Sequence, residues 1–162
     1  MKKVLLILFV LMTSLWGNIE ELLYIESKLY PKIIMLDKSV NKKEKIVFDI
    51  LYDEENYHIA KVMSQLLRKN GVDTRLDKIP RYCKNADAYI LVTKNVSERF
   101  INNLLRSKKL IFSVYPDMIK NSMISVYIGI KVKPIINPSL IKKGYIKLNP
   151  ILLKVAKIYE ED

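Results

Sequence analysis

Hydrophobic residues are concentrated at the start of the chain. An almost wholly apolar run at 4–16 follows two lysines and ends at Gly17, after which the chain becomes polar. A short basic stretch, an apolar segment of this length and a small residue are typical of a secretory signal peptide. A membrane-spanning helix needs roughly 20 apolar residues, so this run is short for one. We therefore predict a signal peptide at 1–17, with an uncleaved N-terminal anchor as the alternative.

From residue 18 onward, helix-like and strand-like patterns alternate. The first two thirds predict a helix at 19–30 that stops before Pro31, a polar loop at 37–44, a strand at 46–52, a helix from Asp53 to Asn70, a strand at 88–93, a helix capped by Asn95, and a strand at 110–115. The stretch 72–83 carries no clear pattern. The three strands are short and continuously apolar, which indicates a largely parallel sheet buried on both faces.

The last third of the chain changes character. Between 124 and 133, apolar and polar residues alternate, which predicts an antiparallel strand at the sheet edge with one solvated face. Asn137 and Asn149 each precede a proline and predict two helix starts, the first helix ending at Gly144 and the second running to the C-terminus. The elements together predict one α/β domain at 18–162: a three-layer sandwich with a mostly parallel central sheet, an antiparallel edge strand and a C-terminal helix.

Charge is distributed unevenly along the chain. There are 28 Lys and Arg against 17 Asp and Glu, a net charge of +11. Residues 118–159 contain eight lysines and no acid. Export through the signal peptide would place this basic segment in the periplasm, away from DNA. We therefore expect no nucleic-acid partner, and instead an acidic protein domain or the membrane surface.

Few residues offer catalytic chemistry. His58 is the only histidine and Cys83 the only cysteine, which gives little support for a metal site or a histidine-activated nucleophile. The acidic run 53–55 is explained by a helix N-terminus, which favours carboxylates. We expect no enzyme activity, no cofactor and no metal. In an oxidising compartment, Cys83 is either a buried small hydrophobe or a thiol that pairs two copies into a homodimer.

The C-terminal run 123–156 resembles the signature of the YfiR-like periplasmic family. That signature has an apolar strand, a basic stretch, a strand leading to an asparagine, a small helix ended by a glycine, and a final helix. The matching positions are Asn137, Gly144, Leu152, Leu153 and Ala156. The family's glycine pair before the strand is replaced by Asn121-Ser122, and its additional cysteines are missing.

This resemblance implies an exported regulator without catalytic residues. Such a protein binds the periplasmic domain of an inner-membrane signalling protein, for example a diguanylate cyclase or a sensor kinase, and so modulates cyclic-di-GMP synthesis or a related signal. From the residues themselves we expect Tyr127 to act as an anchor, because the alternation places it on one face with Lys131 and Lys133. The predicted partner surface comprises Tyr127, Lys131, Lys133, Lys142, Lys143 and Lys147. The alternative function is a small-ligand receptor lobe of a periplasmic solute-sensing system.

Overall fold

A computed structural model describes residues 2–36 and 45–160, with side chains from Ile19 onward. The elements are α1 (Lys2–Met35), β1 (Val47–Tyr52), the 3-10 helix η1 (Glu54–Asn56), α2 (Tyr57–Lys69), β2 (Asp73–Lys78), β3 (Ala88–Val92), α3 (Glu98–Leu105), β4 (Leu110–Ser113), the 3-10 helix η2 (Pro116–Asn121), β5 (Ile124–Ile128), β6 (Val132–Ile136), α4 (Pro138–Lys143), α5 (Pro150–Val155) and β7 (Lys157–Ile158). The loop predicted at 37–44 lies outside the described residues.

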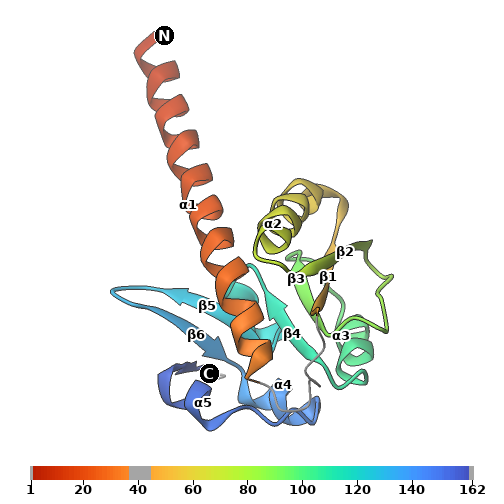
Figure 1. Ribbon diagram of the computed structural model, residues 1–162. Helices are drawn as coiled ribbons and strands as arrows, with labels where there is room; N and C mark the ends of the chain where they lie inside the picture. The colour runs from red at the N-terminus through yellow and green to blue at the C-terminus, as the bar shows by residue number, and fades with distance from the viewer. Residues whose placement is uncertain (1, 37–44, 161–162) are drawn as a thin grey trace.

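One sheet of seven strands organises the domain, in the order β2-β1-β3-β4-β5-β6-β7 (Figure 1). The pairs from β2 to β5 are parallel, β5 and β6 are antiparallel, and β7 is parallel to β6. The strands β1, β3 and β4 lie within the three apolar runs of the sequence. The predicted fold class, an α/β fold with a mostly parallel sheet between helical layers, is confirmed.

Ring contacts identify which helix covers each face of the sheet. Tyr30 of α1 stacks on Phe112 of β4, with ring centroids 4.3 Å apart. Tyr82 contacts both Phe100 of α3 and Tyr89 of β3. Phe112 is in register with the residue that follows Tyr89, and successive strand residues point to opposite faces. Helices α1 and α2, which pack together, therefore cover one face, and α3 covers the other.

Helix α1 is longer than the pattern predicted. The prediction that it stops before Pro31 is wrong, because the helix continues through this proline to Met35. The described side chains of α1, from Ile19 onward, pack on the domain, and the ribbon of the preceding half extends away from it (Figure 1). Within residues 2–36 and 45–160, no helix combines the length and apolarity needed to cross a membrane.

Strand β2 was missed in the unpatterned stretch 72–83. It pairs only with β1 and is therefore an edge strand of the sheet. Its sequence, Asp-Thr-Arg-Leu-Asp-Lys, is mostly charged, and each of its residues is either exposed or half-buried. Charged residues on an edge strand discourage pairing with other chains, and they also hide the strand from a search for apolar runs.

The N-terminal cap of α3 differs from the prediction. Asn95 does not cap this helix. Ser97 does, because its hydroxyl oxygen accepts a hydrogen bond from the backbone N–H of Phe100, and Glu98 is the first helical residue. The side chain of Asp53, as expected, lies at the start of the helical segment that follows β1, where it caps η1.

The segment 124–133 is a hairpin rather than one strand. Residues 129–131 turn the chain between β5 and β6, so β5 pairs on both sides and does not form the sheet edge. The predicted alternation between a buried and a solvated face is also wrong. Ser125 is fully buried, because α1 and the sheet surround the base of the hairpin, whereas the tip projects beyond them and exposes both of its faces.

The two C-terminal helices begin as predicted. The side-chain oxygens of Asn137 and Asn149 accept hydrogen bonds from the backbone N–H groups of Leu140 and Ile151. The prediction that the second helix reaches the C-terminus is wrong. It ends at Val155, and β7 then pairs with β6, which satisfies backbone groups of an otherwise open sheet edge.

Candidate functional site

The tip of the β5–β6 hairpin exposes large apolar side chains. Ile130 is 105% exposed, Ile128 is 50% exposed and Val132 is 46% exposed. Ile128 and Val132 lie directly opposite each other on the two strands. Such clustered exposed aliphatic residues are typical of an interaction site. We define the hairpin surface as Tyr127, Ile128, Ile130, Lys131, Val132, Lys133 and Lys157.

The ring of Tyr127 is held in place at this tip. A Cβ added to Gly129 would lie 2.6 Å from Cε1 of Tyr127, so the ring packs directly over the glycine. Lys157 lies on β7, and its ammonium group is 4.3 Å from the centroid of the Tyr127 ring, a cation–π distance. Tyr127 is paired with Lys133 across the strands and remains 40% exposed. The aromatic side chain is thus both preorganised and accessible.

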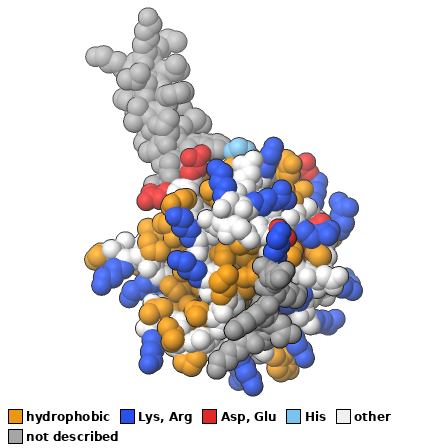
Figure 2. All heavy atoms as spheres, viewed as in Figure 1, with side chains coloured by type: hydrophobic (Ala, Val, Ile, Leu, Met, Phe, Trp, Pro, Cys, Tyr) orange, Lys and Arg blue, Asp and Glu red, His pale blue; other side chains and the backbone are white. Residues whose placement is uncertain are grey.

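The hairpin surface is cationic as well as apolar. One open groove of about 530 Å³, which we call the hairpin groove, is lined by Tyr127, Ile130, Lys131, Lys133 and Lys157. None of these residues is acidic. Figure 2 shows hydrophobic and basic side chains together at the protruding tip of the hairpin, on the left of the molecule. Lysine ammonium groups beside exposed aliphatic residues suit an acidic surface that has an apolar centre.

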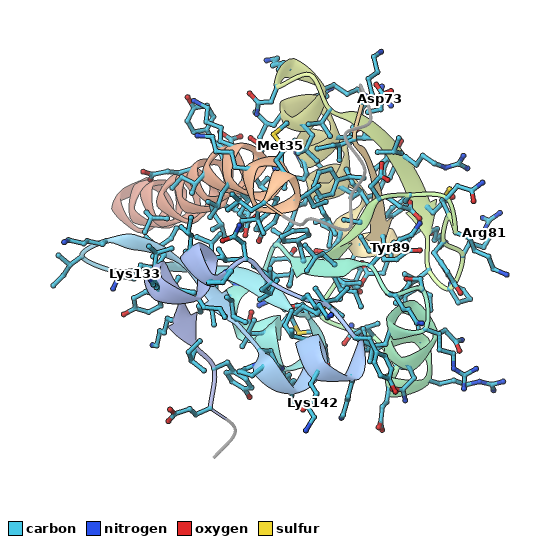
Figure 3. The ribbon with its side chains drawn as sticks, turned by 60° about the horizontal axis from the view of Figure 1, so that its bottom comes forward. Met35, Asp73, Arg81, Tyr89, Lys133 and Lys142 are labelled. Carbon is cyan, nitrogen blue, oxygen red and sulfur yellow. The ribbon has the colours of Figure 1, made fainter. Side chains whose placement is uncertain are left out.

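The structure brings together only part of the predicted partner surface. The hairpin brings Tyr127, Lys131 and Lys133 together, but not on a common face of one strand. Tyr127 and Lys133 are paired across β5 and β6, and Lys131 lies in the turn between these strands. Lys142 and Lys143 lie in the last turn of α4 and do not line the hairpin groove. Figure 3 shows Lys133 and Lys142 well apart.

Lys147 is also separate from the hairpin surface. It is exposed in the loop between α4 and α5 and does not line the hairpin groove. Lys157, by contrast, belongs to the surface but was absent from the predicted set. No strand was predicted at its position, so its side chain could not be placed beside Tyr127.

A second polar cluster lies at the carboxyl ends of the parallel strands. Strand β1 leads into α2 on one face, and its neighbour β3 leads into α3 on the other, which creates the crevice where open α/β sheets bind ligands. At this point Oδ1 of Asp53 accepts hydrogen bonds from the backbone N–H and the side-chain amide of Asn56, at 3.0 and 2.6 Å. Thr93 donates its hydroxyl hydrogen to the other carboxylate oxygen of Asp53.

These hydrogen bonds control the ionisation of Asp53. Burial alone would raise the pKa of this carboxyl, but the hydrogen bonds from Thr93 and Asn56 hold the pKa below its usual value. The neighbouring Tyr115 donates its hydroxyl hydrogen to Oδ1 of Asn56. Burial, reinforced by nearby acids, raises the pKa of Tyr115 to about 12. At neutral pH the cluster therefore contains an ionised aspartate and a protonated tyrosine.

Helix α1 carries a buried carboxyl one turn before Tyr30. Glu26 is fully buried, and its Oε1 accepts a hydrogen bond of 2.9 Å from the hydroxyl of Tyr30. That hydroxyl also lies 2.7 Å from the carbonyl oxygen of Ser113. Among the described residues, Oε2 of Glu26 has no hydrogen-bond partner. Burial raises the pKa of Glu26 well above its usual value, although the bond from Tyr30 opposes the rise.

The remaining reactive side chains do not form a metal site in the described part of the chain. No three His, Cys, Asp or Glu side chains gather there as a potential ligand set. Cys83 is partly buried, and its backbone N–H donates a hydrogen bond of 2.5 Å to Oδ2 of Asp49.

Comparisons with known proteins relate this chain to others only by fold. No family model matches the sequence, and no curated protein matches it either. The fold is similar to that of the solved ABC domain in complex with L-Trp from Streptococcus pneumonia, with a TM-score of 0.57 and 13% sequence identity over 79% of this chain. This chain spans 60% of the length of that one. The likeness is one of architecture.

Proposed function

We propose that the protein is a non-enzymatic periplasmic interaction module. It docks through the hairpin surface on the outer domain of an inner-membrane signalling protein, such as a diguanylate cyclase or a sensor kinase, and modulates that protein's activity. The observation that carries this proposal is the exposed apolar tip, where Ile130 is 105% exposed beside Lys131 and Lys133. The resemblance of the C-terminal segment to the YfiR-like family supports the same function.

Each part of the hairpin surface has a distinct role in this proposal. The aliphatic tip and the ring of Tyr127 supply affinity, since buried apolar and aromatic anchors dominate the binding energy of interfaces. The lysines at the rim attract an acidic partner and mainly set the association rate and its dependence on salt. The ring of Tyr127 is already held by Gly129 and Lys157, so little side-chain entropy is lost on docking.

The periplasmic location rests on the predicted signal peptide. Cleavage after Gly17 would leave in place all the described side chains of α1 that pack on the domain, from Ile19 onward. Intact-mass measurement of the exported protein tests this directly. We expect a mature chain that begins at Asn18, whereas a full-length membrane-associated chain would identify an uncleaved anchor instead.

The docking experiment measures binding of the purified outer domains of inner-membrane diguanylate cyclases and sensor kinases from the same organism. Ile130→Ser and the double variant Lys131→Glu/Lys133→Glu should each weaken binding about tenfold or more. The double variant Lys142→Glu/Lys147→Glu makes the same change of charge away from the hairpin surface and serves as the matched control. Equal binding by all three variants contradicts the docking surface.

Other occupants of the hairpin surface would give different results. Binding to anionic vesicles that Ile130→Ser abolishes, without binding to the signalling domain, identifies the membrane surface. Concentration-dependent self-association that the same variant abolishes identifies a homodimer. Sedimentation of wild type and variant distinguishes these results from docking on a signalling protein.

A small-ligand receptor lobe is the second candidate function. The polar cluster of Asp53, Asn56, Thr93 and Tyr115 favours it, because the cluster lies where doubly wound sheets bind ligands. The similar ABC domain holds L-Trp, which makes an amino acid the first ligand to test. A rise in Tm with an amino acid in the absence of any protein partner supports this function, and no rise across the common amino acids contradicts it.

A further inference from the structure

A second groove lies between the C-terminal ends of α3 and α4. Its volume is about 430 Å³, and its lining residues are Asn102, Leu105, Arg106, Lys108, Lys143 and Tyr145. We call it the α3–α4 groove. It shares no lining residue with the hairpin groove, so it is independent of the proposed docking surface.

The α3–α4 groove is lined by positive charges that have no ion-pair partner among the described residues. Three of its lining residues, Arg106, Lys108 and Lys143, are cationic, and none is acidic. Within residues 45–160, none of the ion pairs involves these three side chains. Like charges gathered in a groove with low-dielectric walls attract anions more strongly than the same charges spread over a surface.

These cations are not needed as caps for the two helices. At the end of α3, the carbonyl oxygen of Leu105 accepts a hydrogen bond of 3.1 Å from the backbone N–H of Lys108. At the end of α4, the carbonyl oxygen of Lys142 accepts one of 3.1 Å from the backbone N–H of Tyr145. Backbone donors thus satisfy these terminal carbonyls, which leaves the guanidinium and ammonium groups free to bind a ligand.

Two strained backbone positions face each other in this groove. Lys108 and Tyr145 both have a φ of 56°, in the left-handed region, and they are the non-glycine residues with positive φ in the described parts of the chain. A glycine usually ends a helix in this conformation, because residues with a Cβ adopt it at a cost. The ammonium group of Lys108 lies 5.7 Å from the ring centroid of Tyr145.

Core packing does not account for the size of the side chain at position 145. Tyr145 is 79% exposed, so its ring adds little buried area to the domain. A strained residue whose large side chain is exposed in a cationic groove is better explained by a ligand than by stability. The ring offers a stacking surface beside the positive charges.

We propose that the α3–α4 groove binds a phosphate monoester attached to an apolar or aromatic group. The guanidinium of Arg106 can hold two phosphate oxygens at once, and Lys108 and Lys143 neutralise the dianion. The apolar or aromatic group of the ligand packs on the ring of Tyr145. Leu105 forms the apolar part of the wall, and the amide of Asn102 can donate to a further oxygen.

The test measures binding of phenyl phosphate to the full mature domain by calorimetry and by NMR. We expect a Kd of about 1 mM or tighter. Inorganic phosphate, which lacks the ring, should bind more weakly. Arg106→Gln and Lys143→Gln should each weaken phenyl phosphate binding about tenfold. Arg99→Gln removes the same charge from the other end of α3 and should leave binding unchanged.

Tyr145→Gly separates a ligand-binding role from a structural one. This variant relieves the left-handed strain, so its Tm should be no lower than that of the wild type, while phenyl phosphate binding should fall several-fold. A fall in Tm with unchanged binding overturns the role of the ring. Absence of phenyl phosphate binding at about 10 mM, or equal binding by Arg106→Gln and the wild type, overturns the proposal.

The phosphate monoester can come from a soluble metabolite or from a lipid headgroup. Vesicles that contain phosphatidic acid, compared with vesicles of phosphatidylcholine alone, distinguish the two sources. Vesicle binding that Arg106→Gln abolishes and phenyl phosphate displaces assigns the groove to the lipid headgroup. Phenyl phosphate binding without vesicle binding assigns it to a soluble ligand.

Discussion

The side-chain amide of Asn70 lies 3.2 Å from the backbone carbonyl oxygen of Ser27, to which it donates a hydrogen bond. This carbonyl is the one that Pro31 leaves unpaired, because the residue four positions later in a helix normally donates its N–H and proline has none. Asn70 terminates α2, so the end of one helix supplies the hydrogen bond that the other helix lacks. The contact explains how α1 continues through Pro31.

We predict that Asn70→Ala destabilises the domain by about 1–2 kcal/mol, because a buried carbonyl loses its donor. Pro31→Ala returns a backbone N–H to the helix. In the Pro31→Ala background, Asn70→Ala should therefore lower the free energy of unfolding by clearly less than it does in the wild type. Urea unfolding of the two single variants and the double variant measures the coupling free energy. Additive effects would show that the two residues act independently.

Asp49 is predicted to make stability depend on pH. Burial, opposed by the hydrogen bond from Cys83 and reinforced by Asp77, raises the pKa of Asp49 from 3.8 to about 6. The folded state therefore holds this proton more tightly than the unfolded state, so the contribution of Asp49 to stability falls as pH rises from 3.8 to about 6. Asp49→Asn should remove this fall, which urea unfolding at several pH values measures. Asp73→Asn, an exposed change on the neighbouring strand, should leave it in place.

Glu26, like Asp49, should make the domain less stable as pH rises, because its pKa is also raised in the folded state. Its pKa is raised by burial, so the carboxyl lowers stability once pH rises far enough to ionise it. Glu26→Gln retains an acceptor for the hydroxyl of Tyr30 and carries no charge. Its Tm should therefore exceed that of the wild type at alkaline pH and approach it at acidic pH. Glu21→Gln, an exposed change on the same helix, should show no such pH-dependent difference in Tm from the wild type.

Asp53 and Asn149 allow the two roles of a helix cap to be separated. Both side chains accept a hydrogen bond from a backbone N–H at the start of a helix. Replacing either residue with alanine should therefore lower the free energy of unfolding by about 1 kcal/mol. Only Asp53 lies in the polar cluster at the carboxyl ends of the strands. If that cluster binds an amino acid, Asp53→Ala should abolish the ligand-induced rise in Tm and Asn149→Ala should preserve it.

The position of the Tyr127 ring is predicted to depend on Gly129. In Gly129→Ala the added Cβ would meet the ring at 2.6 Å, so the ring must leave Gly129 and its contact with Lys157. We expect a change of Tm of less than about 3 °C, because the tip contributes little to the core, together with weaker docking on the signalling domain. Ring chemical shifts of Tyr127 report the displacement. Unchanged shifts would contradict the packing described here.

Much of the fold could be predicted because the relevant signals are local. The strands β1, β3 and β4 lie in mostly apolar runs, and Asn137 and Asn149 lie before prolines, which specifies two helix starts with no knowledge of the rest of the chain. The prediction was wrong where a distant partner replaces a local rule. Pro31 does not end α1 because Asn70 compensates for it, and β2 is a strand because β1 pairs with it.

The sequence by itself determined the fold class and the basic character of residues 118–159, since these depend on composition and on short spacings. Only the tertiary structure decided which lysines act together. Lys157 joins the hairpin surface through the pairing of β7 with β6, whereas Lys143 joins Arg106 in a different groove. The physical reason is that a surface is assembled by strand pairing and helix packing between residues far apart in the chain, and no local pattern records those contacts.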